Sequence, residues 1–341
     1  MNKLTTIGID LAKNSFALVA LSTTGKALWR KTLTRSRMLR FLAQQEPSHI
    51  AMEACAGAHY WGREIQQLGH RVSLLPPQHV KGYQRGQKND YNDAAGIAEA
   101  CQHGQIRPVR VKTLEEQDAQ LFGQLRLQLS QEHTRLINQV RALLAEYGIA
   151  IRQGVTALYA AVPELLDDDA NALTPRLRLL LNRQYQRLQA LRTELAWYEQ
   201  EVKRQAREDD VCCRLMEVPG IGPIVSGTLK HWMGDGQQFK RGRDASAALG
   251  LVPRQHSTGG HQLLLGISKC GNRAVRSQVV HGARAVVAQA GHKVDPLSQW
   301  INRLVATRGY NKAMVALANK LVRIAWIIVA RGEHYQPKAA A

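Results

Sequence analysis

Apolar residues repeat at two different periods along this sequence, and the change between them near residue 114 constrains the fold more than any other feature. The opening stretch, LTTIGIDLAKNSFALVALSTTGKALWRKTL, alternates apolar and polar residues through three short runs, with Thr24-Gly25 at the middle turn. Alternation at period two is typical of half-buried strands, so three antiparallel strands are predicted here. From Leu114 the period becomes that of an amphipathic helix.

Helices and strands are predicted to alternate through the remainder of residues 1–110. RMLRFLAQQ and YWGREIQQLG are predicted helices, the second ended by Gly69, while SHIAMEA and HRVSLLPP are predicted strands. This order predicts an α/β domain over residues 1–110. Asp10 ends the first predicted strand and Glu53 ends the fourth, and both strands are expected to lie centrally in the sheet.

Residues 111–210 are predicted to form a helical arm. Two long apolar stripes at helical spacing run through it: Leu121, Leu125, Leu129, Leu136, Val140, Leu143 and Tyr147, then Leu177, Leu181, Leu188, Leu191, Leu195, Tyr198 and Val202. The last five residues alternate spacings of three and four, as in a coiled coil. DDDANALTP between the stripes is a predicted solvated turn, so a coiled-coil hairpin that joins subunits is expected.

A mainly helical third domain is predicted over residues 211–341. Gly220 and Gly222 in PGIGP allow a tight turn between two helices and direct amide N–H groups outward. Such a helix–hairpin–helix element can hold a nucleic-acid phosphate without reading sequence, although a plain corner between helices has the same signature. The most apolar late stretch, LVRIAWIIVA, is short and carries Arg323, so we expect no membrane span and a cytoplasmic protein.

Positive charge is concentrated at both ends of the chain. The formal net charge is +19, with net values of +8, −2 and +13 for residues 1–110, 111–210 and 211–341. An excess of this size is typical of proteins that contact phosphate. The distribution predicts two nucleic-acid-binding modules joined by a neutral spacer that faces protein.

Two aspartates stand three positions apart in QKNDYNDAAGIAEA, at the predicted start of a helix. Asp90 and Asp93 would share one helix face, where like charges repel unless a cation lies between them. Helix capping explains one such aspartate, but it does not explain Asp10 and Glu53. Mg²⁺ (or Mn²⁺) prefers carboxylate oxygens and retains waters for phosphates. Four acids are therefore predicted to hold two ions that clamp a phosphodiester.

Five blocks of the sequence resemble a known family. IGIDLAKNSF, AMEACAGAHYW and QKNDYNDAAGIAEA resemble the RuvC-like, ribonuclease-H-fold domain of the DEDD transposases from the bridge-RNA-guided insertion-sequence family. VPGIGPIVSGTLKHW and ALGLVPRQHSTGGHQLLLGISKCGNRAVR resemble the carboxy-terminal transposase domain of the same family. By motif, Asp10, Glu53, Asp90 and Asp93 match its catalytic acids. The resemblance covers nearly the whole chain.

The resemblance also implies a nucleophile in the carboxy-terminal domain. In the family that the sequence resembles, a serine of that domain forms a covalent link to DNA beside the acidic cluster of a partner subunit, and the matching segment here is QHSTGG. The family's nucleophile usually directly precedes the first glycine; here Thr258 stands there and Ser257 one residue earlier. Either hydroxyl can attack phosphorus, with Ser257 the first choice because threonine's methyl crowds the approach. A nearby basic cluster would bind phosphate, or would be only surface charge: Arg254, His256, Lys269, Arg273 and Arg276.

These features together predict a DNA transposase of a mobile element. The resemblance implies donor and target DNA as substrates, a guide RNA encoded by the element, and a dimer that assembles into a tetramer, in the bacterial cytoplasm at the nucleoid. Three alternatives remain open: a RuvC-like Holliday-junction nuclease that uses water, an actin-fold sugar or acetate kinase, and a non-catalytic nucleic-acid scaffold. The kinase would need further glycine-rich phosphate loops, and a tail of +13 would serve a nucleotide poorly.

Overall fold

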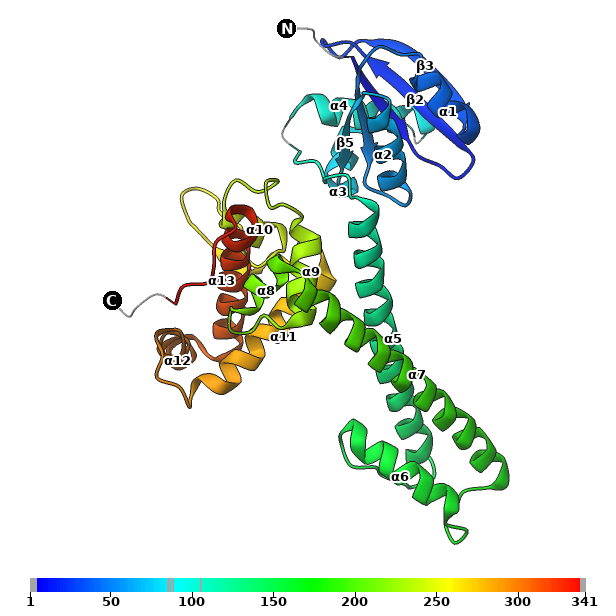
Figure 1. The fold of residues 1–341 in the computed structure, drawn as a ribbon, viewed down its shortest axis with the longest axis vertical. Coiled ribbons are helices and arrows are strands. Elements are labelled where there is room, and N and C mark those ends of the chain that lie inside the picture. Colours follow the sequence, from blue (N-terminus) through cyan, green and yellow to red (C-terminus); the bar gives the residue numbers. More distant parts are fainter. Residues whose placement is uncertain (1–4, 85–86, 88, 105, 338–341) are drawn as a thin grey trace. The chain divides into compact units, whose positions relative to one another are not determined.

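The computed structural model describes residues 5–84, 87, 89–104 and 106–337 (Figure 1). The chain divides into two compact units. The first contains residues 1–117 and 234–240, and the second contains residues 118–233 and 241–341. The division into three domains, inferred above from charge and periodicity, stays a prediction.

The first unit is built on a five-stranded mixed sheet. Its strands are β1 (Thr6–Asp10), β2 (Ser15–Leu21), β3 (Ala27–Thr34), β4 (His49–Glu53) and β5 (Arg71–Leu75), in the spatial order β3-β2-β1-β4-β5. The pairs β1–β2 and β2–β3 are antiparallel, whereas β1–β4 and β4–β5 are parallel. The predicted order of elements is confirmed, and so is the central position of the strands that end in Asp10 and Glu53.

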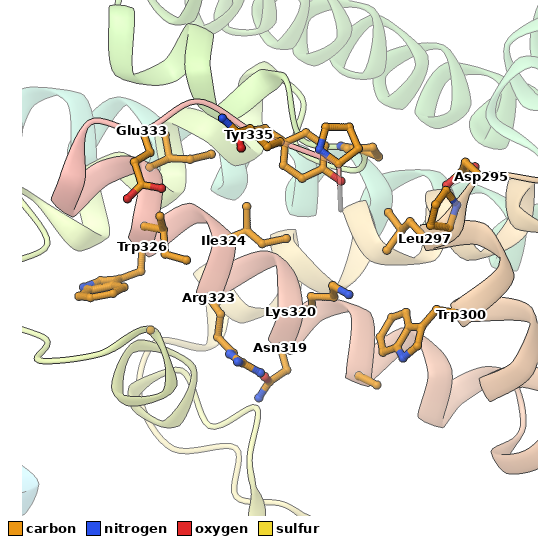
Figure 2. A pocket seen from close by; sticks show the side chains of 18 of the residues that line it. Asp295, Leu297, Trp300, Asn319, Lys320, Arg323, Ile324, Trp326, Glu333 and Tyr335 are labelled. Carbon is orange, nitrogen blue, oxygen red and sulfur yellow. The ribbon is translucent and has the colours of Figure 1, made fainter. Parts of the chain in front are cut away.

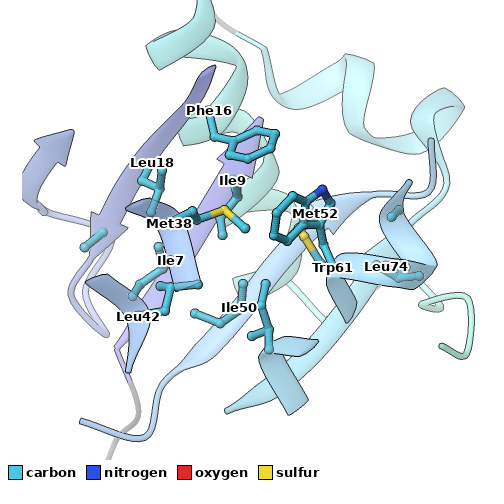
Figure 3. Close-up of a cluster of buried hydrophobic side chains, with 13 residues drawn as sticks. Ile7, Ile9, Phe16, Leu18, Met38, Leu42, Ile50, Met52, Trp61 and Leu74 are labelled. Carbon is cyan, nitrogen blue, oxygen red and sulfur yellow. The ribbon is translucent and has the colours of Figure 1, made fainter. Parts of the chain in front are cut away.

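Helices cover both faces of this sheet. On one face lie α1 (Arg35–Leu42) and α2 (Ala58–Gln67), and on the other lies α4 (Asp90–Gln102). Short turns follow β5, namely α3 (Pro77–Val80) and a 3₁₀ turn at Lys81–Tyr83. The core under α1 and α2 contains Phe16 and Trp61, whose rings meet edge to face with centroids 5.1 Å apart (Figure 3). Aromatic pairs favour this arrangement over a parallel sandwich.

Strand alternation decides which side chains face α4. Ile7 and Ile9 of β1 point into the core under α1 and α2, so Gly8 and Asp10 belong to the opposite face. In β4, Ile50 and Met52 occupy the same core under α1 and α2, while Ala51 packs in the cluster on the α4 side. Glu53, two residues after Ala51, therefore shares the α4 face of the sheet with Asp10.

The second unit begins with an antiparallel helical arm. It comprises α5 (Leu114–Ala145), whose first residues belong to the first unit, α6 (Val155–Asp167) and α7 (Pro175–Glu208). Arg126 pairs with Glu199 at 3.0 Å and Arg187 pairs with Glu132, so α5 and α7 run in opposite directions, as a coiled-coil hairpin requires (Figure 1).

The prediction of a bare two-helix hairpin is wrong in two respects. Helix α6 lies between the long helices in sequence and packs Leu158 and Val162 into the arm's core, so the far end has three helices. The buried face of α5 is Leu136, Ile137, Val140 and Leu144, whereas four residues of the predicted stripe are exposed: Leu121, Leu125, Leu143 and Tyr147. Leu136 and Val140 of the predicted stripe are buried, so the stripe is confirmed in its middle part and wrong at its two ends, and the spacing of leucines did not indicate the third helix.

The rest of the second unit is mainly helical, as predicted. Helices α8 (Asp210–Met216) and α9 (Pro223–Met233) flank the PGIGP turn, and α10 (Gly242–Ala248), α11 (Arg273–Ala290) and α12 (Pro296–Arg308) surround α13 (Tyr310–Arg331). A small hairpin of β6 (Pro253–Gln255) and β7 (Leu264–Ile267) precedes α11.

Helix α13 is longer than the apolar stretch expected from sequence. Among the described helices it alone is long and apolar enough to cross a membrane by length and composition. Its apolar residues, including Leu317, Leu321 and Ile328, are buried against neighbouring helices. Its hydropathy is therefore accounted for by its place in the core of the second unit.

Candidate active site

Two of the predicted acids lie side by side at one edge of the sheet. The parallel register pairs Ile9 with Met52, so the next residues along each strand, Asp10 and Glu53, end neighbouring strands at the same edge. Both side chains are half-buried and belong to the α4 face. A parallel pair of strands brings their carboxyl ends together, which explains why residues 43 positions apart in the chain meet here.

The other two acids lie in the first turn of α4. The N-cap of α4 is Asn89, whose Oδ1 accepts a hydrogen bond from the Asn92 backbone N–H at 2.9 Å. Since Asn89 performs the capping, neither aspartate is needed for it. Asp93 is half-buried and Asp90 is exposed.

A glycine lets α4 approach the strand that carries Asp10. A β-carbon on Gly8 would lie 2.0 Å from the carbonyl oxygen of Ala94 and 2.9 Å from the β-carbon of Ala98. No side chain fits in this space, so the helix backbone lies directly on β1. Asp93, the residue before Ala94, is thereby held at the edge of the sheet where Asp10 and Glu53 end.

The pKa of Glu53 is raised by two of the other acids, which shows that the three lie near one another. Burial raises the pKa of the Glu53 carboxyl, and the negative charges of Asp10 and Asp93 raise it further. Asp90 is not among the groups that act on Glu53. Partial burial raises the pKa of the Cys55 thiol, and the negative charges of Glu53 and Asp10 raise it further. The thiol therefore lies near the same acids. The structure thus brings three of the four acids into one electrostatic neighbourhood.

The acids are near one another but not yet clustered as ion ligands. Within the described residues, no group of three or more His, Cys, Asp and Glu side chains is gathered closely enough to hold a metal ion as it stands. Glu53, Asp90 and Asp93 also form no ion pair with a described lysine or arginine. Carboxylates that lie near one another and repel fit a divalent cation chemically.

The predicted nucleophiles lie at the tip of the β6–β7 hairpin. Thr258 pairs with His261 across a two-residue turn made by Gly259 and Gly260, which have φ values of 55° and 81°. Tight turns between antiparallel strands commonly have positive φ at both central residues, and glycine adopts this conformation readily. Ser257 Oγ accepts a hydrogen bond from Gln255 Nε2 at 2.9 Å. Both hydroxyl residues are exposed.

The basic residues near the hairpin have different surroundings. Arg254, His256 and Arg273 are exposed. Arg276 Nη1 donates to the carbonyl oxygens of Leu249 and Cys270, at 3.1 and 2.8 Å, and so ties α11 to the base of the hairpin.

Lys269 lies next to that anchored base and has an unusual backbone. It is the one described non-glycine residue with positive φ, at 56°. Its neighbours Gly250 and Gly271 pack against backbone so closely that a β-carbon on either would clash. The base of the hairpin is therefore a rigid corner, and its tip is open.

The two glycines of PGIGP also differ. Gly220, with φ at 91°, packs against the backbone of Gly282 in α11, and a β-carbon on Gly220 would lie 3.0 Å from the Gly282 carbonyl oxygen. Gly222 is exposed, and a β-carbon there would meet nothing within 4 Å. Gly220 therefore allows the close packing of the PGIGP turn against α11, whereas Gly222 is the one of the two glycines that is accessible from solvent.

Comparison with known proteins places the chain in a family. Residues 7–149 match a transposase family of the DEDD type, and residues 212–297 match the transposase IS116/IS110/IS902 family. Over 336 residues the chain is 39% identical to the transposase for insertion sequence element IS1111A of Coxiella burnetii, covering 98% of this chain and 92% of that one. The chain belongs to the IS110/IS1111 family of transposases.

Other members of the family are as similar. A probable family 20 transposase of Pseudomonas aeruginosa is 41% identical over 98% of this chain and 99% of its own. The transposase for IS1328 of Yersinia enterocolitica is 38% identical over 97% and 98%. As a member of this family the chain is an enzyme of DNA transposition, which rules out the kinase and the non-catalytic scaffold considered above.

Three residues of the site were not predicted from the sequence. Gly8 has a recognisable signal, since an isolated glycine inside a strand indicates a close backbone approach. Asn89 also has one, because asparagine before a helical run is a favoured N-cap. Cys55 follows β4 by two residues, and nothing in its type or spacing indicated that its thiol lies near Glu53 and Asp10.

Proposed function

We propose that this transposase cuts and rejoins DNA with a divalent cation at its acidic site and a hydroxyl nucleophile from its hairpin. The observation that carries the proposal is the meeting of Asp10, Glu53 and Asp93 on the α4 side of one sheet edge. The mixed sheet with helices on both faces supports a ribonuclease-H-like, RuvC-like fold for this unit.

The acids would hold Mg²⁺ or Mn²⁺. Asp10 and Glu53 extend from neighbouring strand ends, Asp93 lies over them, and exposed Asp90 can turn toward the same edge from the first turn of α4. An ion bound there would polarise the phosphodiester and stabilise the departing oxygen. The protein's own contribution is to hold the carboxylates on rigid elements. Their mutual repulsion would be relieved only when the cation binds.

Ser257, or Thr258 as second choice, would attack the phosphodiester. The hydroxyl oxygen forms a bond to phosphorus, the bond from phosphorus to one sugar oxygen breaks, and the hydroxyl proton ends on that departing oxygen. Exposed Arg254 and Arg273 would bind the non-bridging oxygens, while Gly222 and Lys269 would contact flanking phosphates. Gly220 and Arg276 support these contacts through the corner and the hairpin base.

The acids and the hydroxyl would act from different subunits, in a dimer that assembles into a tetramer. The exposed leucines of the arm support subunit contact there. Donor and target DNA, with a guide RNA encoded by the element, would occupy the basic surfaces. With these partners, we place the protein in the bacterial cytoplasm at the nucleoid.

Mixing variants tests the proposal directly. An Asp10→Asn variant and a Ser257→Ala/Thr258→Val variant should each fail to form a covalent protein–DNA adduct with a nicked or junction substrate. Mixed in equal amounts they should regain part of the adduct, because the two defects lie in different subunits. Mass spectrometry of single variants at residue 257 or 258 would assign the nucleophile. Cleavage that yields only free ends, with no adduct, would instead support a water-using junction nuclease.

A further inference from the structure

A long groove in the second unit takes no part in the proposed chemistry. It runs between α12, α13, the start of α10 and the segment that follows α13, and has a volume of about 1490 Å³ (Figure 2). Small-molecule pockets are commonly about 300–1,000 Å³, so this groove is large for a metabolite. A polymer segment suits its size better.

Aromatic side chains line the groove at separate points along it. Figure 2 shows Trp300 of α12, Trp326 of α13 and Tyr335 of the terminal segment. Trp300 is half-buried, and the Lys320 ammonium lies 4.6 Å from the centre of its ring, whereas Trp326 is only 8% exposed. Trp300 and Tyr335, which is also half-buried, are therefore the rings that a ligand can reach, and Trp300 has a cation beside it.

The terminal segment is fixed as one wall of the groove. Glu217 accepts a hydrogen bond from the Tyr335 backbone N–H at 2.9 Å, and its other oxygen lies 2.7 Å from His334 Nδ1. These contacts lower the pKa of Glu217, first through His334 and then through the Tyr335 N–H. The wall is thus attached to Glu217, two residues before the PGIGP turn.

Cations outnumber anions around the groove. Arg241, Arg243, Arg303, Lys320 and Arg323 line it, against Asp295 and Glu333. Asp295 is engaged as the N-cap of α12, where it accepts from the backbone N–H and the hydroxyl of Ser298. The four arginines form no ion pair with any carboxylate in the described part of the chain, and all four are exposed. Exposed guanidinium groups of this kind favour phosphate.

We propose that this groove binds a single strand of nucleic acid, with an unpaired base against Trp300 and the backbone phosphates on the arginines and Lys320. Aromatic platforms that alternate with cations are how proteins hold single strands without reading sequence. The ring of Trp300 lies inside a concave surface, where the bases of a duplex, already stacked on one another, have no free face to offer. The residues that line the groove include none of the four acids and no residue of the β6–β7 hairpin.

Binding of labelled twelve-nucleotide strands to the full-length protein tests the inference. The probes are a DNA strand, an RNA strand of the same sequence, and the corresponding duplex. Trp300→Ala should weaken single-strand binding about tenfold, while Trp300→Phe should retain most of it. Arg323→Gln should lower the slope of log affinity against log salt by about 0.7, as expected for one lost phosphate contact. The tighter of the DNA and RNA strands identifies the source of the natural ligand.

Lys312→Gln is the matched control. Lys312 is exposed on the same helix as Arg323 and carries the same charge, but it does not line the groove. Equal losses for Arg323→Gln and Lys312→Gln, or duplex binding as tight as single-strand binding, would overturn the inference. Photocrosslinking with a thio-substituted base should map to peptides containing residues 295–308 or 320–331, and crosslinks confined to other peptides would also overturn it.

The result is distinguishable from a failure of the proposed chemistry. The inference rests on the chain's membership of a DNA-acting family and not on the metal site. Asp93→Asn should retain single-strand binding in the groove while losing cleavage. Loss of groove binding in Trp300→Ala with intact folding by circular dichroism assigns the groove whether or not the acids prove catalytic.

Discussion

Gly8 of β1 lies so close to Ala94 of α4 that a β-carbon on the glycine would come within 2.0 Å of the alanine carbonyl oxygen. This contact sets the distance between the helix that carries Asp93 and the strand that carries Asp10. The position of the Asp93 carboxylate therefore depends on the absence of a methyl group at residue 8.

Gly8→Ala should damage both stability and catalysis. The added methyl must push α4 off the sheet, at a cost of about 1–3 kcal/mol or more in the free energy of unfolding. DNA cleavage should fall further than stability does, because Asp93 moves with the helix. Gly123→Ala is the control: Gly123 lies in α5 with nothing within 4 Å of a new β-carbon, and alanine should stabilise that helix by about 0.5–1 kcal/mol. Full cleavage by Gly8→Ala would show that the close approach does not position the site.

Asp93→Asn should abolish cleavage without destabilising the fold. Asp93 and Asp10 both raise the pKa of Glu53, so removing one charge relieves repulsion among the three acids. We expect cleavage to fall at least about a hundredfold, since a metal-ligating or transition-state contact is lost, with a melting temperature equal to or above that of the unmodified protein. Added Mg²⁺ should raise the melting temperature of the unmodified protein more than that of Asp93→Asn. Glu146→Gln, an exposed change in the arm, provides the comparison.

Arg276→Ala and Arg273→Ala should separate support from binding. Arg276 donates to the carbonyls of Leu249 and Cys270, so its loss leaves two acceptors unpaired and should cost about 1–3 kcal/mol of unfolding free energy. Arg273 is exposed at the start of α11, so Arg273→Ala should change the free energy of unfolding by no more than about 0.5 kcal/mol. Titration with labelled DNA should show the opposite order, with the larger change in salt dependence for Arg273→Ala. Equal stabilities of the two variants would contradict the anchoring role of Arg276.

His59 should make the first unit sensitive to mild acid. Burial, followed by the charges of Lys112 and Arg63, lowers the pKa of His59 to about 4, and its Nδ1 accepts a hydrogen bond from the Lys112 backbone N–H. The unfolded chain binds this proton at an ordinary pKa of about 6.5, so stability falls as pH drops from there toward 4. After discounting for partial exposure, the loss should be about 1–2 kcal/mol. His59→Gln should flatten this part of the pH profile, and exposed His292→Gln should not.

Exposed apolar residues of the arm should carry self-association. Leu121 and Leu125 are 47% and 48% exposed, and Trp197 on the antiparallel helix is 56% exposed. Leu121→Gln/Leu125→Gln should weaken the dimer at least about tenfold, because two leucines lose their burial at the contact, as measured by sedimentation. Val294→Gln removes a residue exposed to 87% outside the arm and should leave association unchanged. An unchanged dimer in the double variant would place the subunit contact elsewhere.

Local pattern was enough to determine much of the chain. Alternation at period two predicted β1, β2 and β3, and the strand-ending positions of Asp10 and Glu53 followed directly from where the apolar runs stop. Long helical stripes predicted α5 and α7, and net charge predicted a partner rich in phosphate. These features depend on residues near one another in sequence, where backbone geometry and side-chain period leave few choices.

Only the tertiary structure decided which residues share a surface. The stripe predicted on α5 is buried at Leu136 and Val140, whereas Leu121 and Leu125 of the same stripe are exposed, because a helix buries a residue only where a neighbour covers it. The approach of α4 to Gly8 places Asp93 at the edge of the sheet, whereas Asp90 stays exposed. The carbonyls of Leu249 and Cys270 hold Arg276 in place, whereas Arg273 stays exposed. The groove lined by Trp300 and Arg323 likewise exists only when distant segments pack. Contacts between residues far apart in the chain depend on packing, which periodicity and charge do not encode.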